Sequence, residues 1–394
     1  MPHRNITLLY WFNFFTDFRL YAPIAIIYFT KVTGSYALGM SIFSIIFVTS
    51  AIFEIPTGIL SDYVGRKKTV MFGAITAVIY SILYALSGSF LILALGAMFE
   101  GLSRAFYSGN NEALLYDSLQ EVHEEEKYDE YLGKVSSMFQ VALAISGVIG
   151  GLLASWSFAL IMWISVISQI ICLYLSTQLR EPKNLSSKTG NIYKHIEEAM
   201  RGFMTKKKLR LLSISSIISF GIGEASYQFQ SAFYNSLWPI WAVGVAKTLS
   251  NIGATISFRY SGAINRKFGT IKVLLLSSIF RKSINIIAVS IPTFFSPILM
   301  ATTSLTYGVT TVAERALMQR EFTYHQRATM GSLNAFAWSI FFGIVAFCMG
   351  KVADIISPAY ALLIFMILSI PTIWIYFLLY RDDKDCKKMN ESSS

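Results

Sequence analysis

Long apolar segments alternate with short polar ones along the whole chain. An α-helix rises 1.5 Å per residue, so about 20 apolar residues cross the ~30 Å hydrocarbon core of a bilayer. Twelve segments are long enough, near residues 6–30, 37–61, 69–88, 90–115, 134–156, 157–178, 210–231, 237–262, 271–291, 297–317, 329–350 and 357–380. The pattern predicts an all-α integral membrane protein with twelve transmembrane helices.

A short polar hinge separates the second predicted span from the third. It runs from Gly58 to Lys68 with the sequence GILSDYVGRKK, and a degenerate copy, GAINRKFGTIK, runs from Gly262 to Lys272. Glycines seven residues apart, with basic residues around the second one, therefore recur about half a chain apart. Such a repeat indicates two pseudo-symmetric six-helix bundles.

The connection between the sixth and seventh spans divides the chain. We expect an N-terminal bundle over residues 1–180, a basic cytoplasmic linker over 181–208, a C-terminal bundle over 209–380 and a tail over 381–394. Five apolar side chains of the linker share one helical face and predict a short amphipathic helix at the lipid surface: Ile192, Ile196, Ala199, Met200 and Phe203.

Composition and charge agree with a membrane protein. The chain is 54% hydrophobic and 14% charged, whereas soluble domains carry about 25% charged residues. With both termini in the cytoplasm, only Lys31 and Lys351 of the 33 basic residues fall in outer loops. The distribution of the +10 formal charge thus follows the positive-inside rule and does not indicate a nucleic-acid partner. We expect a multi-pass protein of the cell membrane, which in a bacterium is the plasma membrane.

Several kinds of site are not expected. No GxxxxGK[ST] loop occurs, so no nucleotide partner is predicted. His123-Glu124 begins a zinc-protease motif, but Lys127 replaces the second histidine, and the three cysteines form no CxxC pair. We therefore expect no cofactor and no metal. No set of residues indicates catalysis, so an enzyme is not expected, although a polytopic membrane enzyme and a non-transporting receptor are the alternatives from other classes.

The hinge resembles the signature loop G-x-L-x-D-x-x-G-R-[RK] of the major facilitator superfamily. The matching residues are Gly58, Leu60, Asp62, Gly65, Arg66 and Lys67. A second match runs from Glu112 through Asp117 to Gly151, and Glu314 to Gly331 resembles its counterpart in the second half. The resemblance implies a secondary transporter that works by alternating access, with a cavity between its two bundles.

The resemblance also implies a cytoplasmic gate at the hinge. In the family this cluster latches the two halves together in the outward-open state. We expect Gly58 to allow a close helix crossing, and Asp62 to cap a helical turn or face a helix N-terminus. Arg66 is expected to engage Asp117 bidentately, with Glu112 as its second candidate.

The fifth predicted span resembles a narrower group. Its segment Ser146-Gly147-x-x-Gly150-Gly151 is similar to the G-P-x-x-G-G signature of twelve-helix drug:proton antiporters, but differs at the first two positions. The resemblance implies proton-coupled efflux of a small amphiphilic compound or drug, so that the partners are a small molecule, protons and the lipid bilayer. A proton-coupled symporter that imports a small metabolite is the alternative. Small residues that only let helices approach would also explain the segment.

Ionisable residues inside the spans are candidates for a proton or substrate path, because burying a charge in a bilayer is costly. They lie in spans one, four and seven, which line the central cavity in the family: Asp17, Arg19, Glu100, Arg104 and Glu224, with the polar Gln228 beside the last. We hypothesise that Asp17 and Glu224 include the proton-coupling carboxylate, while Arg19 and Arg104 tune them or pair with them.

Several of these charges have competing explanations. Glu100 and Arg104 are four residues apart and can form a structural pair, whereas Glu224 has no obvious local partner. Three further basic residues have no assigned role: Lys247, Arg281 and Lys282. The last two lie in span nine, which is peripheral in the family, and are expected to reach an acidic neighbour or to snorkel.

Overall fold

The computed structural model describes residues 3–182, 206–321 and 327–392, and within them every regular element is helical. The first half contains α1 (His3–Asp17), η1 (Ala22–Ile24), α2 (Ala25–Thr33), α3 (Tyr36–Val64), α4 (Arg66–Ala85), α5 (Phe90–Tyr107), α6 (Asn110–Gln120), η2 (Glu125–Lys127), α7 (Tyr128–Ala154) and α8 (Phe158–Gln178). The second half contains α10 (Lys207–Asn235), α11 (Ile240–Phe268), α12 (Thr270–Ser290), α13 (Ser296–Thr302), η3 (Thr303–Thr306), α14 (Tyr307–Glu321), α15 (Arg327–Ile355), α16 (Pro358–Leu368) and α17 (Pro371–Ser392).

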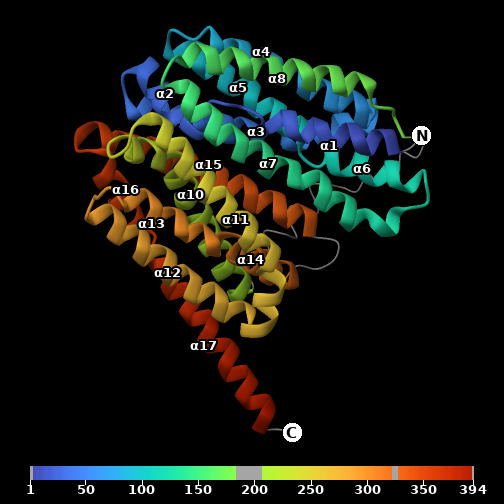
Figure 1. Cartoon of the computed structure of the whole chain (residues 1–394). Coiled ribbons are helices and arrows are strands. Elements are labelled where there is room, and N and C mark those ends of the chain that lie inside the picture. Colours follow the sequence, from blue (N-terminus) through green and yellow to red (C-terminus); the bar gives the residue numbers. More distant parts are fainter. Residues whose placement is uncertain (1–2, 183–205, 322–326, 393–394) are drawn as a thin grey trace.

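These helices form the twelve predicted passes, arranged as two bundles that lie one above the other in Figure 1. Within the described residues, eight helical segments are long and apolar enough to cross a membrane by length and composition alone. The passes made by α1–α2, α10, α11 and α13–α14 are not among them, and all four contribute polar side chains to a central cavity. The predicted amphipathic helix of the linker lies outside the described residues.

Four passes are interrupted, which the apolar pattern did not predict. Spans one, four, ten and twelve are each built from two helices. A break frees backbone groups that lipid cannot hydrogen-bond, so the protein must satisfy them. At the break in span one, Gln169 Nε2 of α8 donates to the carbonyl oxygens of Phe15 (3.2 Å) and Thr16 (3.4 Å). Ser165 Oγ of the same helix accepts from the Leu20 N–H at 3.1 Å.

Lys282 satisfies the break in span twelve. Its ammonium group donates to the carbonyl oxygen of Ser369, between α16 and α17, and to Thr372 Oγ1 at 2.6 Å. A cation is favoured where a helix ends, because free carbonyl groups point there. The expectation that Lys282 reaches an acidic neighbour or snorkels is therefore wrong: its partners are oxygens of the adjacent pass.

The hinge is a single-residue turn in both halves. Gly65 ends α3 and begins α4 with φ 97° and ψ 158°, and Gly269 does the same between α11 and α12 with φ 85° and ψ 129°. Positive φ with ψ this large is accessible almost only to glycine. The repeat read from the sequence is thus a repeat of backbone geometry.

The first hinge carries a helix cap supplied from the end of the N-terminal half. The carboxylate of Glu181 accepts from the backbone N–H groups of Arg66 (2.6 Å) and Lys67 (2.9 Å), at the start of α4. A Cβ atom at Gly65 would lie 2.7 Å from that carboxylate, whereas one at Gly269 would have nothing within 4 Å. Asp62 was expected to fill the capping role. It lies instead on the last turn of α3, and Glu181 is the cap.

Gly58 does not mark a close helix crossing, so that expectation is wrong in this structure. A Cβ atom built on Gly58 would have no atom within 4 Å apart from its own helix and neighbours. The residue lies inside α3, whose backbone is helical there.

The hydrophobic cores show where the two bundles join. One large cluster contains residues of both halves, among them Phe29, Phe43, Phe229 and Phe342. Near the hinges each half has a separate cluster: α1, α4, α6 and α8 supply one, and α10, α12, α14 and α17 supply the other. Both chain ends lie at this hinge end, because Asn5 Nδ2 donates to the carbonyl oxygen of Arg180 (3.0 Å) and Asp382 pairs with Lys207 (3.7 Å). The bundles are therefore packed together at one end and separate at the other.

Three glycine substitutions test the two hinges. Gly269→Ala is expected to lower the free energy of unfolding by about 1–3 kcal/mol through backbone strain alone. Gly65→Ala should cost more, because the new methyl group also displaces Glu181 from two charge-assisted hydrogen bonds worth about 1.5–3 kcal/mol each. Gly58→Ala, inside a helix with open space around it, should be neutral or slightly stabilising. The measurement is the thermal unfolding midpoint in detergent; equal midpoints for Gly65→Ala and Gly58→Ala would contradict this account.

Candidate functional site

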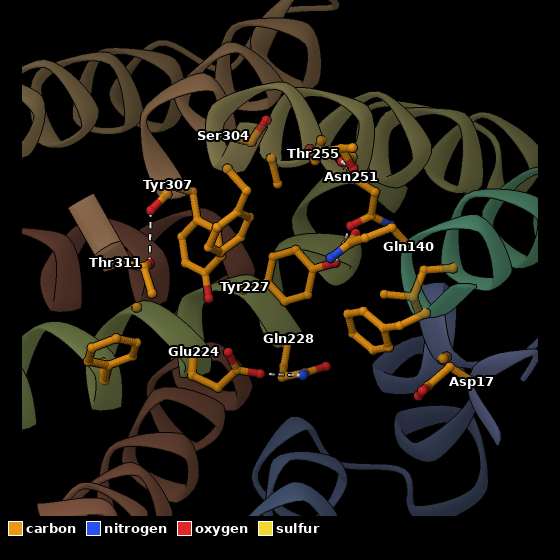
Figure 2. Close-up of a pocket in the computed structure, with 18 of the residues that line it drawn as sticks. Asp17, Gln140, Glu224, Tyr227, Gln228, Asn251, Thr255, Ser304, Tyr307 and Thr311 are labelled. Atoms are coloured by element: carbon orange, nitrogen blue, oxygen red, sulfur yellow. Dashed lines mark hydrogen bonds between the residues drawn. The ribbon is translucent and has the colours of Figure 1, made fainter. Parts of the chain in front are cut away.

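A cavity of about 1700 Å³ lies between the two bundles, with walls from α1, α5 and α7 on one side and α10, α11, α12 and α14 on the other. All six ionisable or polar residues proposed from the sequence for a proton or substrate path line it: Asp17, Arg19, Glu100, Arg104, Glu224 and Gln228. Figure 2 shows Asp17 on one side of this space, with Glu224, Tyr227 and Gln228 of α10 on the other.

Glu100 is the centre of a buried charge network in the N-terminal wall. Its side chain is 4% exposed and accepts from Arg19 Nη1 (2.7 Å), Arg104 Nη2 (2.8 Å) and the Tyr84 hydroxyl (3.0 Å). The predicted pairing of Glu100 with Arg104 is confirmed. Because a buried ion needs several partners to offset its lost hydration, Glu100 is well suited to remain charged and fixed.

Asp17 occupies the edge of the same network. It has one ion pair, with Arg19 Nη2 at 3.2 Å, and its side chain is 18% exposed. It is also the last residue of α1, so it sits where the span breaks and the backbone changes direction. Of the two carboxylates in this wall, Asp17 is the one that a proton or ligand can reach.

Glu224 has a partner that the sequence did not suggest. Gln228 Nε2, one helical turn further along α10, donates to its carboxylate at 2.7 Å. The Tyr227 hydroxyl between them donates to Asn251 Oδ1 of α11 at 3.3 Å, as the dashed lines in Figure 2 show. A neutral amide is a weaker partner for a carboxylate than an arginine, so Glu224 is less firmly held than Glu100.

Lys247 is the largest omission from the sequence-based site. It is 3% exposed, donates to the carbonyl oxygen of Tyr227 and lies 3.7 Å from the centre of the Tyr227 ring. A cation over an aromatic face is stabilised by the ring quadrupole, and more so when water is excluded. Lys247 therefore fixes the backbone and ring of Tyr227 at the cavity wall. Its place in the middle of an apolar span was the available signal.

The cavity opens at the hinge end. Its lining there includes the Lys134–Glu130 pair, whose side chains are 57% and 60% exposed, together with the exposed Arg259 and Arg315. Glu112, the second partner considered for Arg66, also lines this mouth.

The opposite end is closed by a helix cap that crosses between the halves. The carboxylate of Asp354, at the end of α15, accepts from Ser35 Oγ (2.5 Å) and from the backbone N–H groups of Tyr36 (2.6 Å) and Ala37 (3.0 Å). These groups form the N-terminus of α3, where negative charge is favoured. Gly350, one turn earlier, lets the helices meet: a Cβ there would lie 2.6 Å from Ala37 Cα.

The glycines of the fifth span let α7 of the N-terminal half pack closely against α11 of the C-terminal half. A Cβ on Gly151 would lie 3.1 Å from Gly244 Cα of α11, and one on Gly147 would lie 3.0 Å from the Gly244 carbonyl oxygen. A Cβ on Gly150 would collide with the carbonyl oxygen of Leu20 at the break in span one. Close helix approach thus accounts for all three glycines in this structure.

The cluster of charged residues at the first hinge, Asp62, Arg66 and Asp117, lies entirely on the N-terminal half. Arg66 Nη1 lies 3.5 Å from Asp62 and Arg66 Nε lies 3.9 Å from Asp117. Arg66 Nη1 also donates to Ser61 Oγ (3.0 Å) and to Asn110 Oδ1 (3.3 Å). The bidentate contact expected with Asp117 is replaced by one long contact. Among the described residues, every partner of Arg66 belongs to the half that contains it, and no ion pair joins this cluster to the other half.

Comparisons with known proteins agree with this architecture. The family model described as the Major Facilitator Superfamily matches residues 6–340. An uncharacterised MFS-type transporter of Methanocaldococcus jannaschii is 23% identical over 86% of this chain and 88% of its own length. An uncharacterised transporter of Buchnera aphidicola is 28% identical, but the match covers only 36% of this chain and 35% of that relative.

Among solved structures, a mutant form of the nucleoside transporter NupG superposes with a TM-score of 0.82. It is 14% identical, and the match covers 95% of this chain and 100% of that one. At this identity the likeness concerns the fold. Together with the family match, the twelve passes and the central cavity, it leads to one conclusion: the chain belongs to the Major Facilitator Superfamily and is a multi-pass membrane transporter rather than an enzyme.

Proposed function

We propose that this transporter exports a small amphiphilic compound in exchange for protons, by alternating access. The observation that carries the proposal is the pair of reachable carboxylates, Asp17 and Glu224, which face one cavity from opposite halves (Figure 2). Each is held by few partners: Asp17 by Arg19 at 3.2 Å and Glu224 by Gln228 at 2.7 Å.

These contacts offer a simple coupling chemistry. A neighbouring positive charge or hydrogen-bond donor stabilises an ionised carboxylate, whereas loss of water favours the protonated form. A substrate that places a hydrogen-bond donor beside Glu224 would favour the ionised carboxylate and so release a bound proton. Conversely, a proton arriving at Glu224 would remove that contact and favour release of the substrate, so that the two bind in turn as an exchange requires.

The charges at the hinges support an orientation for the cycle. The positive-inside rule favours a cytoplasmic location for both hinges, both chain ends and the linker. On that topology the cavity is open to the cytoplasm in this structure, as an exporter requires when it loads its substrate. Support for export comes from the resemblance of the segment from Ser146 to Gly151 to the antiporter signature. Its glycines pack at the α7–α11 contact, which has to open in the outward-open state.

Alternating access then requires the two ends to exchange roles. The cap of Asp354 on α3 and the glycine contacts have to separate, while the hinge end closes. We propose that Asp62, Arg66 and Asp117, with Gly65 and Lys67 shaping the turn, form part of a gate that engages the other half in that second state. Exposed ion pairs contribute only about 0–1 kcal/mol each, which suits contacts that must release in every cycle.

The proton-coupling assignment predicts that Asp17→Asn and Glu224→Gln each lower pH-gradient-driven transport at least tenfold. The reason is that neither amide can bind and release a proton. The measurement uses proteoliposomes with an imposed pH gradient and a panel of dyes, drugs and sugars. Asp382→Asn, an exposed carboxylate outside the cavity, is the control and should transport normally. Full proton-driven transport by both cavity variants would refute the assignment. Substrate and protons moving in the same direction would favour import instead.

If the Asp354 cap on α3 holds the end opposite to the hinges closed, Asp354→Ala should shift the protein toward the outward-open state. Losing a charged acceptor of three hydrogen bonds is worth about 1.5–3 kcal/mol, so the ratio of outward-open to inward-open molecules should rise at least tenfold. Distances between spin labels at the exposed positions Leu86 and Ile356, in a cysteine-free background, report this ratio. Lys351→Ala, on the same helix, serves as the control. Unchanged distance distributions in Asp354→Ala would show that the cap does not hold the outer end closed.

The hinge predicts that Arg66→Ala and Asp62→Asn slow transport several-fold with normal membrane insertion. Both variants keep the cavity intact but weaken the outward-open state, because the gate cluster is lost. Lys272→Ala, in the corresponding second-half loop, should have a much smaller effect, since that loop has Asn265 near the position of Asp62. The transport rate per inserted molecule is the quantity to compare. Near-normal rates in both Arg66→Ala and Asp62→Asn would refute the gate and show that these charges serve only to orient the chain in the membrane.

A further inference from the structure

The charges of the two cavity walls are balanced differently. In the N-terminal wall, Arg19 and Arg104 are both engaged by Glu100, and Arg19 also pairs with Asp17. The two arginines and two carboxylates of this network neutralise one another. At the mouth, Lys134 pairs with Glu130 at 2.6 Å. Apart from Glu112 at the rim, the N-terminal wall therefore presents no unbalanced charge to a ligand.

The C-terminal wall carries an excess of positive charge. Two carboxylates line it, Glu224 and Glu314, against five basic side chains: Lys247, Arg259, Arg281, Lys282 and Arg315. Among the described residues, none of these five forms an ion pair within 4.0 Å of either carboxylate. Arg259 and Arg315 lie at the exposed mouth, whereas Arg281 and Lys282 lie near the middle of α12. Unbalanced charge at membrane depth is costly and is a mark of function.

The basic residues of this wall fall into two groups. Lys247 and Lys282 are buried and committed to protein oxygens. Arg281 of α12 and Arg315 of α14 line the open cavity, and no hydrogen bond to another described residue is found for either guanidinium. Two different helices thus each contribute a guanidinium group to the same cavity, beside Tyr307 and Glu314 of its lining.

The surroundings of these arginines suit an amphiphilic ligand. Asn285, one turn from Arg281 on the same face of α12, also lines the cavity, and its buried Oδ1 atom has no partner among the described residues, so it can accept a hydrogen bond from a donor on the body of a ligand. Tyr307 and Phe258 lie edge to face, with ring centres 5.8 Å apart, and provide an apolar surface beside the charged groups. Planar guanidinium groups bind carboxylate, sulfonate and phosphate oxygens in pairs of parallel hydrogen bonds.

We propose that the transported compound is an organic anion, whose oxyanion group is held by Arg281 and Arg315 while its apolar body lies against Tyr307 and Phe258. The inference rests on the proposed function, since it takes the cavity as the transport path. It also fixes the charge moved per cycle. Export of a monovalent anion in exchange for one proton is equivalent to moving two positive charges inward. The membrane potential then adds to the pH gradient, at about 2.3 kcal/mol per charge per 100 mV.

Probes that share one body and differ in the headgroup test the substrate class. Pyrenebutyrate, the phosphate ester of pyrenebutanol and pyrenebutyl-trimethylammonium are titrated against the full-length protein in detergent, with pyrene fluorescence as the readout. The anions should bind at least tenfold more tightly than the ammonium compound. The stronger of the two anions identifies the headgroup as carboxylate or phosphate. Equal or tighter binding of the ammonium probe would overturn the proposal.

Substitutions of the two arginines test whether the anion binds at the C-terminal wall. Arg281→Gln and Arg315→Gln should each weaken binding of the preferred anion by about ten- to hundredfold, because each removes a charged hydrogen-bond donor. Arg281→Lys should be intermediate, since it keeps the charge but loses the fork. Lys272→Gln, an exposed lysine on α12 outside the cavity, should bind normally. Unfolding midpoints identify any variant that fails to fold, and unchanged anion affinity in both folded glutamine variants would refute the site.

Transport measurements separate this inference from the function on which it rests. In proteoliposomes, an inside-negative potential set with potassium and valinomycin should speed export of the anionic probe beyond the effect of the pH gradient. If the anion binds through the two arginines but no pH gradient drives it, proton-coupled export fails and the substrate class stands. If a pH gradient drives the ammonium probe and not the anion, the substrate class fails and proton coupling stands.

Discussion

The structure depends on one constraint: inside a membrane, each polar group freed from a helix must find its partner within the protein. The passes that line the cavity need breaks and charged residues, and every break creates such groups. Gln169 and Ser165 of α8 bond the backbone around the break in span one, and Lys282 of α12 bonds the carbonyl between α16 and α17. Polar side chains of one pass thus hold the freed backbone of another, and α12 does so with Lys282 while the adjacent Arg281 lines the cavity. This requirement explains why Gln169 and Ser165 occur on α8, outside the cavity lining.

The same constraint shapes the contact between the bundles. Helices in lipid gain little from the hydrophobic effect on association, so they associate through close packing and specific polar contacts. Here glycines of α7, α11 and α15 bring backbones together, and Asp354 adds charged hydrogen bonds to the start of α3. These contacts lie at one end only, and the other end has separate cores. Two bundles joined at one end form a cavity that opens at the other, which is the geometry of one state of an alternating-access cycle.

The sequence predicted the features that local pattern determines. Twelve passes followed from apolar length, and the hinge repeat followed from glycines whose geometry recurs at Gly65 and Gly269. The Glu100–Arg104 pair followed from helical spacing. What could not be predicted depends on contacts between distant segments. Glu181 caps α4 from 115 residues away, and Asp354 caps α3 from the other half of the chain. Asp62, beside the hinge, was therefore a reasonable candidate for the cap, and only tertiary structure could replace it with Glu181.

The uneven balance of charge between the two walls has a consequence for coupling. A negatively charged group entering the N-terminal wall would have to displace Glu100 or Asp17 from an arginine before it could bind there. In the C-terminal wall it would meet the guanidinium groups of Arg281 and Arg315, which have no hydrogen bond to another described residue. An anion would therefore bind the C-terminal wall first and affect the network of Arg19 only when the bundles move relative to each other. In the proposed cycle, protonation of Asp17 and ligand binding near Arg281 would be linked through that motion and not through direct contact. A carrier built this way can exchange a proton for an anion without requiring both to occupy one site.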